Sequence, residues 1–245
     1  MESSKISPRT EAVERLENFI AVNHLAAHTC IPSERDLCEM WALNRTTLRF
    51  AVDALVAQGK LYRKKGFGTY VSEPKQVRNL MGVNSMSSEM RQNGIDLSTR
   101  ILTMRTMEAT KQVSKKLHVP LGHKVYEFVR MRSVNSVPCI LETMWLDGEL
   151  CADFDRYYQD KASVFSIFKN IYKLNPVRGE EKISVTYLSP EEAELFDLPE
   201  GSPVFFVSGV TQLEDGTPLE SYKALFRADR FKFVSAITPK EEGGA

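Results

Sequence analysis

Cysteine is scarce in this chain of 245 residues, which contains only four. The cysteines form no Cys-x-x-Cys pair and show no ligand-like grouping with the four histidines. Disulfide scaffolds and structural zinc sites both require such pairs or closely spaced ligands. The sequence therefore predicts reduced thiols and no metal site, and we expect no cofactor.

Long apolar runs are also missing. No stretch offers the roughly 18 uninterrupted apolar residues that indicate a membrane-spanning helix. Residues 1–19 are charged and lack the apolar segment of a secretory signal. We therefore expect a cytoplasmic protein without membrane segments. With 42% hydrophobic and 26% charged residues, the composition is typical of a globular chain of one or two domains.

The chain has no net charge, because 32 basic residues balance 32 acidic ones. This balance alone argues against a nucleic-acid-binding protein, since such domains are usually basic. The charge is unevenly distributed, however. The segment from Trp41 to Lys75 contains seven basic and two acidic residues, a local excess of five positive charges. A basic module within a neutral chain is expected where that module alone meets phosphate.

The stretch from Ile31 to Val71 carries two helix start signals. Ser33 and Asn44 are favourable N-cap residues, and each precedes apolar residues at helical spacing. The second helix is expected to turn one apolar stripe toward a core, formed by Leu48, Ala51, Val52, Leu55 and Val56. Its first turn then leaves a set of polar residues on the outer side, namely Arg45, Thr46, Thr47 and Arg49. Arginine can bond a guanine edge and threonine can bond phosphate, so this end of the helix suits a DNA major groove.

A basic hairpin is expected after Gly59, where the apolar pattern changes to period two. Lys64 and Lys65 lead into the tip Gly66-Phe67-Gly68. Glycines at such a tip allow positive φ angles and close approach of the backbone to phosphate. We therefore predict a second DNA contact at the hairpin.

This region resembles the winged helix-turn-helix of the GntR family of bacterial transcription regulators, through the blocks IPSERDL, NRTTLRFAVDAL and GFGTYV. One departure is Ala42, at a position in the turn that relatives often fill with glycine. If Ala42 has to be left-handed, it costs about 1 kcal/mol relative to glycine. We take as DNA-binding candidates Arg35, Asn44, Arg45, Thr46, Thr47, Arg49, Lys64, Lys65, Gly66 and Gly68.

The domain boundary is expected just after this module. Residues 73–82 have no apolar periodicity and include Pro74, which predicts a linker between a DNA-binding domain at 1–72 and a second domain at 83–240. In the second domain, hairpins alternate with short helices, one of which is an amphipathic helix expected from Ser163 to Ile171. The predicted turns are Asn135-Ser136 and Glu214–Thr217. This order predicts an α+β fold whose helices cover an antiparallel sheet.

The second domain resembles the UTRA effector-sensing domain of the HutC branch of the GntR family. The segments that carry the resemblance include SEMRQNGIDLSTRIL, VPCILETMWL and SYKALFRADRFKF, within residues 83–233. The resemblance implies a chorismate-lyase-like α+β fold, a homodimer, and a small ligand that alters the spacing of the DNA-binding modules.

Arg130 and Arg132 stand two residues apart on a predicted strand and so share one face. Two guanidinium groups on one face repel each other unless an anion or carboxylate lies between them. From spacing alone, a solvated strand face is the favoured interpretation. The resemblance implies that these arginines hold the acidic group of an effector, such as a sugar phosphate. It also implies ligand contacts at four further positions, namely Glu142, Ser163, Phe165 and Phe226. Glu142 can alternatively pair with an arginine, and Phe226 lacks the hydroxyl of the tyrosine that many relatives carry.

Three functions are compatible with these patterns. The sequence favours a dimeric transcription repressor that binds double-stranded operator DNA and responds to a small anionic metabolite. An enzyme with a chorismate-lyase-like fold is the first alternative, although the chain shows no nucleophile elbow, metal set or phosphate loop, and we predict no catalytic residues. The second alternative is a DNA-binding regulator without a ligand.

Overall fold

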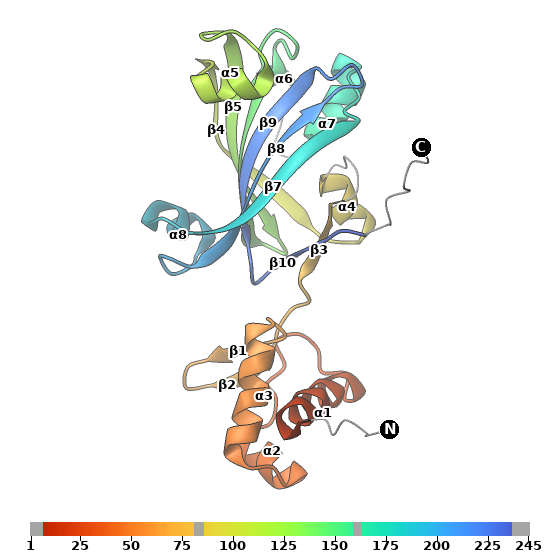
Figure 1. Cartoon of the computed structure of the whole chain (residues 1–245), viewed down its shortest axis with the longest axis vertical. Coiled ribbons are helices and arrows are strands. Elements are labelled where there is room, and N and C mark those ends of the chain that lie inside the picture. The colour runs from red at the N-terminus through yellow and green to blue at the C-terminus, as the bar shows by residue number, and fades with distance from the viewer. Residues whose placement is uncertain (1–6, 81–85, 159–162, 237–245) are drawn as a thin grey trace, which may run out of the picture. The chain divides into compact units, whose positions relative to one another are not determined.

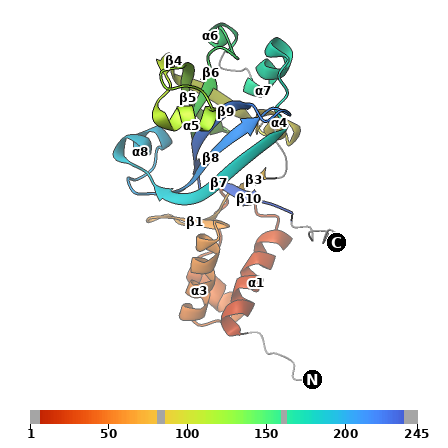
Figure 2. The same cartoon turned by 45° about the horizontal axis from the view of Figure 1, so that its top comes forward.

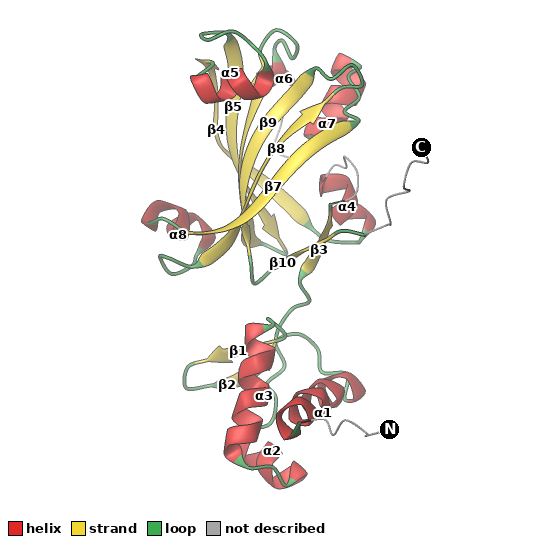
Figure 3. Cartoon of the chain, in the orientation of Figure 1, coloured by secondary structure: helices red, strands yellow, loops and turns green. Residues whose placement is uncertain are grey.

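The computed structural model describes residues 7–80, 86–158 and 163–236 (Figure 1). Contacts divide the chain after Gln76 into an N-terminal and a C-terminal unit. The N-terminal unit is helical with a small hairpin, and the C-terminal unit is built on a large sheet (Figure 3). Among the described residues, no helix is long and apolar enough to cross a membrane.

The N-terminal unit contains three helices and one hairpin. The helices are α1 (Pro8–Val22), α2 (Glu34–Trp41) and α3 (Arg45–Ala57), and the antiparallel strands are β1 (Leu61–Lys64) and β2 (Gly68–Val71). The predicted caps are present, because the Ser33 hydroxyl accepts from the backbone N–H of Asp36 and the Asn44 side chain accepts from that of Thr47. The predicted stripe of α3 faces the core, where Leu48, Ala51, Val52 and Leu55 are fully buried.

The turn between α2 and α3 is left-handed at Ala42, with φ 53° and ψ 38°. This is the conformation in which glycine is favoured over residues with a Cβ atom. The turn is held by the backbone N–H of Ala42, which donates to the carbonyl of Cys38. The buried side chains of Leu37 and Leu48 on either side stabilise the helix pair despite this local cost.

The C-terminal unit is organised by a six-stranded antiparallel sheet, in the spatial order β4-β5-β6-β9-β8-β7. Its strands are β4 (Leu97–Glu108), β5 (Lys124–Val134), β6 (Val137–Asp147), β7 (Arg178–Tyr187), β8 (Pro203–Gln212) and β9 (Pro218–Arg227). The predicted turn at Asn135 and Ser136 joins β5 to β6, with both residues at positive φ as a two-residue hairpin requires. A separate two-stranded sheet pairs β3 (Gln76–Asn79) with β10 (Phe231–Val234).

Short helices cover both faces of this sheet (Figure 2). The helices α5 (Lys111–Leu117) and α8 (Pro190–Phe196) pack on one face. The other face is covered by α4 (Met86–Gln92), α6 (Phe154–Tyr157), α7 (Val164–Ile167), the π-helix η1 (Phe168–Tyr172) and the β3–β10 pair. This two-sided cover agrees with the predicted α+β fold.

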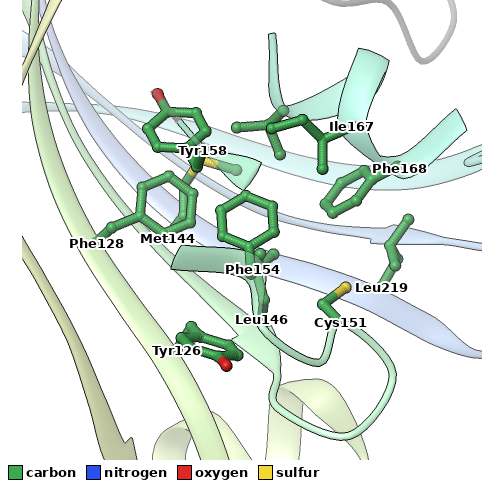
Figure 4. Close-up of a cluster of buried hydrophobic side chains, with 11 residues drawn as sticks. Tyr126, Phe128, Met144, Leu146, Cys151, Phe154, Tyr158, Ile167, Phe168 and Leu219 are labelled. Carbon is green, nitrogen blue, oxygen red and sulfur yellow. The ribbon is translucent and has the colours of Figure 1, made fainter. Parts of the chain in front are cut away.

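An aromatic cluster packs on the sheet face that α6, α7 and η1 cover (Figure 4). Phe154 stacks on Phe128 of β5 and on Tyr158, with ring centroids 5.4 Å and 5.5 Å apart. All three rings are at least 96% buried. Each buried aromatic side chain contributes on the order of 2 kcal/mol, so the cluster holds α6 and Tyr158 firmly against the sheet.

Two predicted segments differ from the structure. The predicted linker over residues 73–82 contains β3, because Gln76–Asn79 pairs with a strand more than 150 residues away that no local pattern reveals. The predicted domain start at 83, its end at 240 and the last residues of the linker fall outside the described residues. The amphipathic helix expected from Ser163 to Ile171 is a single turn, α7, followed by the π-helix η1.

Candidate functional site

The exposed end of α3 is the first candidate surface. Arg45, Thr46 and Arg49 are exposed on its first turns, as predicted. Thr47 is not, since it is 9% exposed and lies beside the apolar stripe, four residues before the buried Ala51. The amide oxygen of Asn44 accepts the N–H of Thr47 at 2.8 Å, so this side chain is engaged as the helix cap.

Carboxylates lie next to several cations of this surface. The Arg49 Nε atom is 3.7 Å from Glu34, and Arg35 donates to Glu39 at 3.1 Å. The side chains of Arg35 and Arg49 are more than 70% exposed, so these pairs are worth less than about 1 kcal/mol. Both arginines can therefore exchange their carboxylate partners for phosphate or a base edge at little cost.

The hairpin tip presents a second exposed cationic group. Lys64 and Lys65 are exposed, and the Lys64 ammonium lies 4.9 Å from the ring centroid of Phe67. Gly66 and Gly68 have φ angles of 81° and 120°, which residues with a Cβ atom rarely adopt. The glycines are thus required by the shape of the tip, which leaves its backbone open to a phosphate.

The second candidate site is a cavity of about 1120 Å³ in the C-terminal unit. It lies over the sheet face that carries Phe128, Arg130 and Arg132 and continues around the edge strand β7 toward α5. Its lining includes Arg130, Arg132, Glu142, Ser163 and Phe165, five of the predicted effector residues. Residues outside the predicted effector set also line it, namely Arg78, Ser87, Thr211, Glu220 and Tyr222.

Arg130 is buried and fully engaged. Its Nε donates to the Glu142 carboxylate at 2.6 Å, and its Nη1 donates to the Tyr158 hydroxyl at 2.7 Å. Burial acts to lower the pKa of Arg130, but the charge of Glu142 outweighs it and the pKa is raised. The pKa of Glu142 is lowered, because the charges of Arg130 and Arg132 outweigh the effect of its burial. The predicted alternative for Glu142, a salt bridge to an arginine, is therefore present.

Arg132 is only 2% exposed and lacks a comparable partner. Its Nη2 donates to the Ser87 hydroxyl at 2.6 Å, while its Nη1 is 4.0 Å from Glu142. Its Nε has no hydrogen-bond partner among the described residues. Burial, followed by the charge of Arg130, lowers the pKa of Arg132 to about 10, which still leaves it cationic at neutral pH. A buried, incompletely paired guanidinium that lines a cavity is suited to bind an anion.

Phe226 does not lie in the cavity lining. It is 2% exposed and packs edge-to-face on Phe231 and Phe233 of β10, with ring centroids 5.2 Å and 5.4 Å apart. Phe226 shares the sheet face of Arg132, but the β3–β10 pair covers it. Its role in the structure is core packing, and the prediction of a direct effector contact is not supported.

Comparison with known proteins matches both units to families. Residues 8–71 match the bacterial regulatory proteins of the gntR family, and residues 92–232 match the UTRA domain, which alone covers more than half of the chain. The chain belongs to the GntR family, in its UTRA-containing HutC subfamily. The expected family and the two-domain α+β fold are thereby confirmed.

Relatives of this GntR-family chain extend over most of its length. The transcriptional repressor NagR of Bacillus subtilis is 28% identical over 227 residues, which cover 91% of this chain and 92% of NagR. The histidine utilization repressor of Pseudomonas putida is 25% identical over 180 residues, covering 74% of this chain and 72% of the relative.

The solved structure of PhnF from Mycobacterium smegmatis has the same fold, with a TM-score of 0.70 at 22% identity, and it covers 94% of this chain and 100% of PhnF. The GntR family consists of regulators, so this chain is a transcription regulator and the alternative of an enzyme is set aside.

Proposed function

We propose that this GntR-family protein is a repressor whose operator affinity is controlled by a small anionic effector in the cavity of its C-terminal unit. The observation that supports the effector is Arg132, a buried cation in the cavity lining whose Nε has no partner among the described residues. The repressor names of NagR and the histidine utilization repressor support the direction of regulation.

Within the cavity, we infer that Arg132, Ser87 and Arg130 face the acidic group of the effector. Glu142 lies 2.6 Å from Arg130 and 4.0 Å from Arg132, so its single carboxylate offsets only one of the two cationic charges. A phosphate ester, as in a sugar phosphate, offers several strong acceptors to these donors. Ser163 caps α7 beside the cavity, where its hydroxyl already accepts the N–H of Ser166 at 3.4 Å.

The protein is proposed to act as a cytoplasmic homodimer on a two-fold symmetric operator. Two recognition helices can bind matching half-sites only when they stand about one helical turn of DNA apart, roughly 34–36 Å. An effector that binds one arrangement of the C-terminal units more tightly shifts the protein toward it. If that arrangement has the wrong spacing, the operator is released.

Base reading by α3 predicts different losses at two cationic positions. Arg49→Ala should weaken binding to a selected operator fragment by about 1–3 kcal/mol, with little change on random DNA, because base contacts carry the specificity. Lys64→Ala should weaken binding to both DNAs alike and lower the salt slope by about 1, because it meets phosphate only. Gel shifts over a series of salt concentrations measure both quantities. Lys169→Ala, at an exposed site of the C-terminal unit, is the control, and equal losses on both DNAs for Arg49→Ala would remove Arg49 from the base-reading residues.

Effector control predicts that a variant of the cavity can still bind operator DNA but is no longer released from it by the effector. A thermal-shift screen of sugar phosphates, amino acids and organic acids identifies the compound that stabilises the full chain. Arg132→Ala should keep operator affinity within about twofold and lose release by that compound, since one charge-assisted bond is worth roughly 1.5–3 kcal/mol. Arg105→Ala, at an exposed arginine of β4, serves as the control. A normal response of Arg132→Ala would place the effector elsewhere.

A further inference from the structure

Another arginine, Arg78 of β3, reaches the cavity and is not among the residues predicted from the sequence. Arg78 lines the cavity, and its side chain is 18% exposed. Its Nη2 donates to the carboxylate of Glu181 on β7, and the same carboxylate oxygen accepts from the Tyr222 hydroxyl on β9. The Arg78 guanidinium also lies 5.5 Å from the ring centroid of Phe226. This arginine is therefore held between an ion pair and a buried ring at the edge of the effector cavity.

Two arginines of the cavity, Arg78 and Arg132, have N–H groups without a hydrogen-bond acceptor among the described residues. Arg130 has a full partner in Glu142, whereas Arg132 is 4.0 Å from that carboxylate. The Nε atoms of Arg78 and Arg132 are both buried, and neither has a hydrogen-bond partner among the described residues. Two guanidinium groups on one cavity, each with an unmet N–H, are the donors that an anion with several oxygens can satisfy.

We propose that Arg78 is a further anion ligand of the cavity and that an incoming anion replaces Glu181 as its partner. This inference rests on the proposed function and adds a specificity residue to it. A dianionic phosphate group can accept from Arg78 and Arg132 together, because it carries two charges and three acceptor oxygens. A monocarboxylate has one charge and satisfies only one of these arginines in full. The cavity therefore selects phosphate groups over carboxylates.

Substitutions of the two ion-pair partners separate a ligand role from a structural one. If the Arg78–Glu181 pair only holds β3 against β7, losing either partner should affect anion binding equally. If Glu181 competes with the anion for Arg78, the two losses should have opposite effects. Arg78→Gln removes a ligand and should weaken binding, whereas Glu181→Gln frees the ligand and should strengthen it. The amide oxygen of glutamine can still accept from Tyr222, so the second change is mild.

The test is titration calorimetry of the full chain with inorganic phosphate at pH 8, with ionic strength held constant by sodium chloride. We expect Arg78→Gln to raise the dissociation constant at least tenfold and Glu181→Gln to lower it severalfold. Arg78→Lys should stay within about threefold of the unmodified chain because it keeps the charge. Arg105→Gln, which removes an exposed arginine of β4, should have no effect. Acetate should bind at least tenfold more weakly than phosphate.

Each contrary result has a distinct meaning. Equal weakening by Arg78→Gln and Glu181→Gln overturns the proposal, because it identifies the pair as structural. Loss of binding in Arg132→Gln with none in Arg78→Gln also overturns it, but leaves the effector site in place. Unchanged binding in Arg132→Gln contradicts the proposed function itself. Acetate binding as tightly as phosphate, or no phosphate binding by the unmodified chain, overturns the selection of a dianion. If Arg78→Gln does not fold, Glu181→Gln and Arg78→Lys decide the question.

Discussion

Glu142→Gln should destabilise the C-terminal unit by about 3 kcal/mol at pH 7. The carboxylate of Glu142 is the charge partner of Arg130 at 2.6 Å and the nearest anion to Arg132, and both arginines are buried. Removing one member of a buried ion pair leaves an uncompensated charge, which typically costs 3–5 kcal/mol. Urea unfolding measures the loss, and a Trp41→Phe background leaves Trp145 as the only tryptophan to report on the C-terminal unit.

The pH dependence of this loss follows from the lowered pKa of Glu142. A carboxylate with a lowered pKa in the folded state stabilises the protein above its unfolded pKa, and the contribution disappears as the pH falls through the folded value. The difference between Glu142→Gln and the parent should therefore shrink in acid. Glu180→Gln is a matched control, because its ion pair with Lys182 is more than 75% exposed and should be worth less than about 1 kcal/mol. A loss no larger than that of the control would contradict the importance of the buried pair.

Local patterns in the sequence were sufficient for most of the fold. The caps at Ser33 and Asn44 and the turn at Asn135 and Ser136 are local, because the residues that make the hydrogen bonds or adopt the special φ angles are a few positions apart. The pairing of β3 with β10 could not be predicted in this way. The segment Gln76–Asn79 contains one apolar residue among polar ones, and its partner strand lies far along the chain. A linker was therefore the natural interpretation of a segment that the structure assigns to a sheet.

The part of the candidate site that lies on a single strand could be predicted from the sequence. Arg130 and Arg132 are two residues apart, so the period of a strand alone brings them to one face. Glu142 is joined to Arg130 by the register of a hairpin whose turn could be recognised. Arg78, Ser87 and Tyr158 enter from three other segments, and no spacing in the sequence relates them to the arginines. The pair of Thr211 and Glu220 could have been found, because it follows from the register of the predicted hairpin around Glu214–Thr217.

Glu220 carries the second large effect, a stability difference that depends on pH. It is 2% exposed, its Oε1 accepts the Thr211 hydroxyl at 2.8 Å, and its Oε2 has no partner among the described residues. Burial raises the pKa of Glu220 to about 7, well above the value near 4.3 expected in the unfolded chain. The folded state then binds a proton that the unfolded state has already released. The contribution of Glu220 is therefore fully present below about pH 4.3 and is lost as the pH rises through about 7.

Glu220→Gln removes this proton linkage. As the pH rises from 5 to 8, its free energy of unfolding should increase by roughly 2–3 kcal/mol relative to that of the parent. A buried glutamine amide adds its own cost at both pH values. The prediction therefore concerns how the difference in unfolding free energy between Glu220→Gln and the parent changes from pH 5 to pH 8. Urea unfolding in the Trp41→Phe background measures it, and the titrating groups that do not interact with Glu220 cancel in the comparison. Glu200→Gln, on an exposed turn, should show no such change. If the two stability curves stay parallel from pH 5 to pH 8, Glu220 titrates like an exposed carboxyl, and the cavity wall around it must be open to water in solution.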